Sequence, residues 1–204
     1  MARIRLADEG PMDAAQQSVY DRIVAGPRGR VVGPLRAVLL VPELADRWQR
    51  FGEQLRYHTS LPGRISELAI VTVARRYNSQ VEWAVHAQAA LDAGINNDVL
   101  EAIRDCRPPG FASATDRDAY EYTRQLLVAG DVDIALHEAV CTHWGETGAV
   151  ELTALIGYYA MVAMMLNAQD IPTPDGSRPL QPARDDRGQI TLSRLGPARA
   201  VAGG

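Results

Sequence analysis

Lysine is absent from this sequence, and all 21 of its Lys and Arg residues are arginines. The absence of lysine excludes a Schiff-base lysine, a P-loop lysine and a lysine general base. Cysteine is almost as scarce, because Cys106 and Cys141 are the only two and they form no CxxC pair. Two such cysteines support neither a disulfide scaffold nor a cysteine-built zinc site.

A basic excess is missing as well. The chain has 25 acidic and 21 basic residues, which gives a formal net charge of −4. Proteins that bind nucleic acid or membrane surfaces carry clustered basic residues, so we expect neither partner. The first ten residues lack an apolar stretch, so we expect no secretory signal and a cytoplasmic location. GxGxxG, GxSxG and HExxH motifs are also absent.

The residues that are present predict an all-α protein. With 204 residues, of which 47% are hydrophobic, the chain is large enough to bury a proper core. Apolar residues recur at three- and four-residue spacing, as in Leu44, Trp48, Phe51 and Leu55, and no convincing strand-like alternation occurs. The pattern predicts helices at 12–24, within 35–59 with Pro42 near a start, and at 64–77, 80–93, 97–105, 115–129, 133–144 and 149–168.

Two of these helices are unusually apolar. Residues 64–77 are apolar almost all round, which is typical of a helix in the core or in an oligomer interface. Residues 149–166 are long enough to cross a membrane and carry one charge, Glu151. This segment is isolated, has no flanking basic anchors and contains Gly157 and two tyrosines in its middle. We therefore predict a buried core or subunit-interface helix.

The composition divides the chain into three parts. Residues 1–34 are polar, contain Gly and Pro, and are predicted to form an N-terminal arm. Residues 35–170 are predicted to form the helical domain. Residues 171–204 are rich in Pro, Gly and Arg, cannot sustain a helix, and are predicted to form a tail that is either ordered against a neighbouring subunit or loose.

One cluster of residues can carry chemistry. Glu82 and His86 are four residues apart, so both project from the same face of the helix at 80–93. Glu67 lies in the apolar helix at 64–77, where a carboxylate is costly unless it is paired. A turn at Asn78-Ser79 folds the two helices into a hairpin, and Glu67 meets His86 if the arms are offset. A buried Glu–His pair keeps an imidazole oriented and basic.

Structural explanations compete with this one. Ser79 and Glu82 have the spacing of a capping box, His86 can be a structural histidine, and Trp83 can be core packing. His137 and Cys141 are four residues apart and His143 is close by. No third ligand follows at a spacing typical of metal sites, so we expect no metal site.

The stretch SELAIVTVARRYNSQVEWAVHAQAALDAGI (66–95) resembles the carboxymuconolactone decarboxylase family, whose all-helical fold is AhpD-like. VELTALIGYYAMVAMMLNA (150–168) adds a second similarity, so the resemblance covers roughly residues 35–170. The AhpD-like branch has a glutamate, a CxxC pair and a histidine where this chain has Glu67, Ser79, Glu82 and His86. Both thiols are missing, so a disulfide-cycling peroxidase is not expected. Glu82-Trp83 instead matches the decarboxylase-like branch.

The resemblance implies a cofactor-independent enzyme that decarboxylates a lactone or a related small ring carboxylic acid. It implies His86 as the proton carrier, Glu67 as the residue that orients it, and Glu82 as a second acid or base or as the group that polarises a lactone carbonyl. It also implies a homo-oligomer, a trimer or hexamer, which the two apolar helices favour.

Substrate binding is expected to involve Ser79, Trp83 and one guanidinium. Arg75 is our choice for the guanidinium, with Arg76, Arg56 and Arg36 as the other candidates. Two alternatives remain: a lyase, isomerase or hydrolase for another small enolisable substrate, and a non-catalytic oligomeric binding protein.

Overall fold

The structure is a computed structural model of the chain, and it describes residues 1–182 and 192–196. All of the regular secondary structure in these residues is helical, which confirms the all-α prediction. A short 3-10 helix at Ala7–Glu9 is followed by eight α-helices: α1 (Ala14–Ala25), α2 (Leu35–Val38), α3 (Pro42–Tyr57), α4 (Gly63–Arg76), α5 (Gln80–Asp92), α6 (Asn97–Arg104), α7 (Ala114–Ala129) and α8 (Ile134–Ala168).

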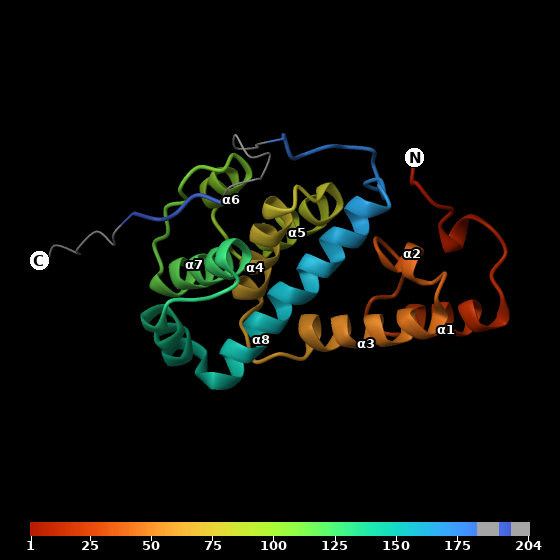
Figure 1. Cartoon of the computed structure of the whole chain (residues 1–204), viewed down its shortest axis with the longest axis horizontal. Helices are drawn as coiled ribbons and strands as arrows, with labels where there is room; N and C mark the ends of the chain where they lie inside the picture. The colour runs from red at the N-terminus through yellow and green to blue at the C-terminus, as the bar shows by residue number, and fades with distance from the viewer. Residues whose placement is uncertain (183–191, 197–204) are drawn as a thin grey trace, which may run out of the picture.

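Helix α4 is the centre of the bundle, and it packs against α5, α7 and α8 (Figure 1). Its all-round apolar pattern explains this position, because Leu68, Ala69, Val71 and Val73 are completely buried. Burial in the core, one of the two expectations for this helix, is therefore what the structure shows.

The predicted hairpin is formed by α4 and α5. Asn78 makes the turn with a left-handed φ of 52°, a conformation that asparagine tolerates better than most residues. The Ser79 N–H donates to the Ala74 carbonyl at 2.8 Å and closes the end of α4. Gly94, with a φ of 88°, follows the end of α5, and its N–H donates to the Leu91 carbonyl.

Helix α8 contains both of the last two predicted helices. Gly145 separates them with a φ of 71° and a ψ of 174°, so the helix bends sharply there. By length and composition α8 could cross a membrane, but half of its most apolar window is buried inside the protein. Because buried core helices pass the same test, this is weak evidence for a span.

The N-terminal segment packs onto the same core as the central helices. Helix α1 packs against α3 through Val19 and Ile23, and Leu6 is completely buried. Pro42 occupies the start of α3, as predicted, where its missing N–H leaves no hydrogen bond unmade. The boundary at residues 34/35 remains a prediction.

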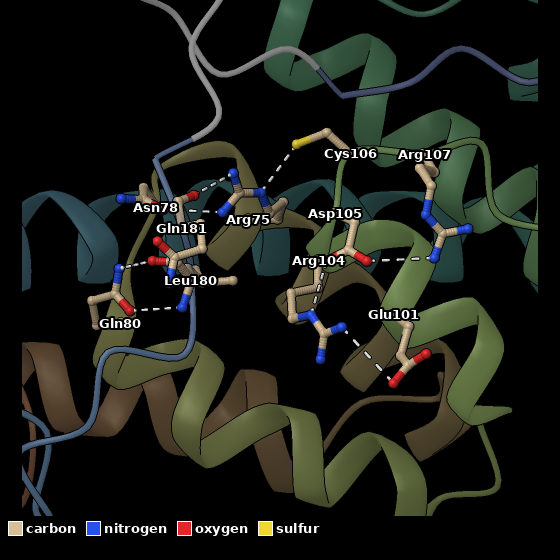
Figure 2. A network of polar contacts seen from close by, with 10 residues as sticks. All are labelled: Arg75, Asn78, Gln80, Glu101, Arg104, Asp105, Cys106, Arg107, Leu180 and Gln181. Atoms are coloured by element: carbon tan, nitrogen blue, oxygen red, sulfur yellow. Dashed lines mark hydrogen bonds and ion pairs between the residues drawn. The ribbon is translucent and has the colours of Figure 1, made fainter.

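The described part of the tail is extended and lies against its own chain. The Gln80 side chain accepts from the Leu180 N–H at 2.9 Å and donates to the Leu180 carbonyl at 3.0 Å (Figure 2). Further along, the Tyr120 hydroxyl donates to the Ser193 carbonyl at 2.8 Å. Leu180 and Leu192 are each 2% exposed, so these stretches are not loose. The predicted tail at 183–191 and 197–204 lies outside the described residues.

Candidate functional site

Glu67 and His86 form the pair that the sequence suggests. Nδ1 of His86, from α5, lies 2.7 Å from Oε2 of Glu67, from α4. The imidazole side chain is 6% exposed and the carboxylate 13% exposed, so the pair is largely shielded from water. When Nδ1 donates to the carboxylate, the other ring nitrogen, Nε2, is left as the proton-exchanging atom.

Tyr159, from α8, packs against the imidazole of this pair. Its ring meets the His86 imidazole edge-to-face, with centroids 5.1 Å apart and planes at 86°. Burial raises the pKa of Tyr159, so its phenol stays neutral while it fixes the plane of the imidazole. The sequence analysis missed this residue, because the helix at 149–168 was treated as core packing.

Glu82 lies one turn before His86 on α5, and its carboxyl group has different surroundings from that of Glu67. It is 3% exposed, and neither carboxyl oxygen has a hydrogen-bond partner among the described residues. Burial raises the pKa of Glu82 to about 8, an effect that the nearby Ser79 hydroxyl partly offsets. The side chain is therefore mainly protonated at neutral pH and can donate a hydrogen bond.

The capping-box explanation for Ser79 and Glu82 is wrong. Ser79 is the N-cap of α5 and is completely buried, but it makes no side-chain capping bond, and its hydroxyl has no hydrogen-bond partner in the part of the chain described. Burial of the hairpin turn takes both side chains inward, away from the backbone N–H groups that a capping box would use. Both side chains are thus left with unsatisfied polar atoms inside the protein.

Arg75 is not brought to this cluster. It is completely buried, and its guanidinium donates to Asn78 Oδ1 at 3.0 Å, the Gln181 carbonyl at 3.0 Å and Cys106 Sγ at 3.1 Å (Figure 2). These three contacts join the hairpin turn, the segment after α6 and the tail. Arg75 therefore has a structural position, and we do not assign substrate binding to it.

The other predicted binding residues are divided between the core and the surface. Trp83 is 5% exposed and belongs to the hydrophobic core, so the packing explanation accounts for it. Arg36 forms an ion pair with Asp8 at 2.8 Å. Arg56, on α3, carries a charge that opposes the rise in the pKa of Tyr159.

Two hollows lie elsewhere on the surface. One of about 470 Å³ is lined by Tyr77, Asn78 and residues of the segment that follows α8. The other, of about 750 Å³, is lined by His137, Cys141 and other residues of α7 and α8. Sγ of Cys141 lies 3.7 Å from Nδ1 of His137. In the described residues no three His, Cys, Asp or Glu side chains are grouped as metal ligands would be.

Together the fold and the site define an all-helical protein with a buried carboxylate–imidazole pair on a central helical hairpin. Residues 42–125 match the model of the Carboxymuconolactone decarboxylase family. This match confirms the resemblance seen in the sequence, and it contains Glu67, Ser79, Glu82 and His86.

A solved structure has the same fold. The chain is similar to an uncharacterized peroxidase-related protein from Silicibacter sp. TM1040, with a TM-score of 0.67 over 83% of this chain and 90% of that chain. At 14% identity this similarity shows the fold alone. No curated protein matches the chain.

Proposed function

We propose that this protein is a cofactor-independent acid–base enzyme that decarboxylates a lactone or a related small ring carboxylic acid. The observation that carries the proposal is the buried Glu67–His86 pair, with the protonated carboxyl of Glu82 one turn away on α5. The match of residues 42–125 to the family model supports the same reaction class.

The reaction needs one proton and no other reactant. The bond between the ring carbon and the carboxylate breaks, CO₂ leaves, and the electron pair moves through the ring onto the lactone carbonyl oxygen as an enolate. A proton from the imidazolium then forms the new C–H bond, and solvent reprotonates the imidazole. The sum is a carboxylate and a proton converted to a C–H bond and CO₂.

Each residue has a role that its surroundings suit. His86 delivers the proton from Nε2, because Nδ1 is occupied by Glu67. Glu67 is a positioning residue that fixes the imidazole and stabilises its charged form. Glu82, protonated by its burial, donates a hydrogen bond to the developing enolate oxygen, a contact that is stronger in the transition state than in the substrate.

Thiol chemistry is the main competing proposal, because the similar solved structure is named peroxidase-related. Ser79 and Glu82 occupy the two places where the AhpD-like branch has its cysteines, so a CxxC disulfide cannot form there. We therefore propose that the protein is not a thiol peroxidase. A lyase, isomerase or hydrolase for another enolisable substrate would use the same pair.

The test is CO₂ release from γ-carboxymuconolactone by the purified wild type, His86→Gln and His143→Gln. His143 is the matched control, because it also pairs with a carboxylate, Asp118, at 2.9 Å but lies outside the site. We expect His86→Gln to lower kcat by roughly 10²–10⁴-fold and His143→Gln to keep the wild-type rate. No turnover by the wild type would contradict this substrate, and equal loss in both variants would contradict the role of His86.

A further inference from the structure

Beside the Glu67–His86 pair, three separate segments bring hydrogen-bond donors together. Arg28 comes from the loop after α1, Trp48 from α3 and Tyr158 from α8. The rings of Trp48 and Tyr158 meet with centroids 6.0 Å apart. Arg28 and Tyr158 meet at Gly52, where a Cβ atom would overlap the Tyr158 hydroxyl and lie 2.6 Å from Nη2 of Arg28. A glycine at this position allows the guanidinium and the phenol to approach each other.

The cluster has more donors than acceptors. Nε1 of Trp48 and Nε of Arg28 are buried and have no hydrogen-bond partner among the described residues. Both groups can only donate. Burial raises the pKa of Tyr158, whereas the charge of Arg28 and hydrogen bonding by Trp48 and Arg28 oppose the rise. One phenol oxygen cannot satisfy both an indole N–H and the five N–H donors of a guanidinium, and unsatisfied buried donors are costly.

We propose that Arg28, Trp48 and Tyr158 form an anion subsite that binds a carboxylate of the substrate. A carboxylate supplies two oxygens that match the fork of a guanidinium, and it has lone pairs left for the indole N–H and the phenol O–H. Among the described residues Arg28 forms no ion pair, and the acidic neighbour on α3, Glu53, lies 4.0 Å from His58. The cluster therefore keeps the positive charge of Arg28. This subsite supplies the guanidinium that Arg75 does not.

The subsite is joined to the catalytic pair by two tyrosines whose rings meet edge-to-face. The rings of Tyr158 and Tyr159 are 5.4 Å apart, and Tyr159 in turn contacts His86. Tyr158 and Tyr159 therefore lie between a carboxylate bound at Arg28 and the imidazole.

This arrangement, which rests on the proposed function, specifies the substrate further. Ion pairing stabilises the charge that a departing carboxylate must lose, so holding that group would slow the reaction. The subsite therefore holds a carboxylate that the product retains.

Benzoate tests the subsite without any turnover, because it has the ring carboxylate but no suitable path for losing CO₂. The readout is the indole ¹H–¹⁵N signal of Trp48, assigned by its absence in Trp48→Phe. We expect benzoate to shift this signal saturably at constant ionic strength, and neutral benzamide to leave it unchanged. Arg28→Gln should weaken benzoate binding by about tenfold or more, with Arg28→Lys intermediate because it keeps the charge but loses the fork.

Arg47→Gln is the matched control, because Arg47 precedes Trp48 on α3 but points to solvent. Its side chain is 73% exposed and pairs with Glu43. It should bind benzoate like the wild type. Equal affinity in Arg28→Gln and Arg47→Gln would overturn the proposal, as would shifts confined to Trp83 or Trp144. Benzoate binding at Trp48 by a wild type that releases no CO₂ would support the subsite and contradict only the decarboxylation.

Discussion

Burial gives the two glutamates of the site different states. Glu67 faces an imidazole at 2.7 Å and keeps 13% of its side chain exposed, whereas Glu82 is 3% exposed and has no hydrogen-bond partner among the described residues. The first can orient a proton carrier, and the second can act as a neutral acid at a pH near 7. Different surroundings thus fit two carboxyl groups of the same site for different tasks.

Glu82 should make the stability of the protein depend on pH. In the unfolded chain Glu82 loses its proton near pH 4.5, but in the native protein it does so only near 8. Between these values the unfolded state is the more deprotonated one, so the wild type loses stability as the pH rises. Relative to the wild type, Glu82→Gln should gain on the order of 4 kcal/mol in unfolding free energy between pH 5 and pH 8.5.

Urea unfolding at the two pH values measures this difference. Glu138→Gln is the control, because Glu138 is exposed on α8 and its replacement should leave the pH dependence of the wild type unchanged. A stability difference between Glu82→Gln and the wild type that stays constant with pH would contradict the buried, protonated state.

The sequence predicted those site residues that local spacing controls. Glu82 and His86 share a helix face, and a two-residue turn brings Glu67 to them, so spacing and one hairpin were sufficient. Tyr159 and Arg28 come from α8 and from the loop after α1. Their approach depends on packing between distant segments, which no spacing rule describes.

At the scale of elements, α8 shows how one residue determines the path of a helix. The predicted helices at 133–144 and 149–168 are both present, but they continue into each other through Gly145. The φ of 71° and ψ of 174° at this position are accessible almost only to glycine. The sequence indicated the break, but not that the helix resumes at once after it.

Alanine at the two glycines of α8 should therefore have opposite effects. Gly145→Ala forces a side chain into the strained conformation and should lower the unfolding free energy by about 1–3 kcal/mol. Gly157 has helical geometry and open space where a Cβ would lie, so Gly157→Ala should raise it by about 0.5–1 kcal/mol. Thermal and urea unfolding of the two variants measure these changes. A change of the same sign in both would refute the assignment of strain to Gly145.

At the scale of the whole molecule, segments far apart in the sequence assemble the site and enclose it. The pair comes from α4 and α5, Tyr158 and Tyr159 from α8, Trp48 from α3 and Arg28 from the N-terminal segment. On another side of α4, Arg75 and Gln80 hold the tail at Leu180 and Gln181 (Figure 2). The composition predicted a tail without helix, but not its attachment, because single hydrogen bonds to backbone atoms leave no pattern in a sequence.

The central claim is that the Glu67–His86 pair, and not a thiol, carries the reaction. The most direct measurement is γ-carboxymuconolactone turnover by Glu67→Gln beside the Cys106→Ser/Cys141→Ser double variant. The account predicts that the cysteine-free protein keeps the wild-type rate and that Glu67→Gln loses roughly 10²-fold or more, because the imidazole is no longer held by a charged partner. A cysteine-free protein without activity, or a fully active Glu67→Gln, would contradict it.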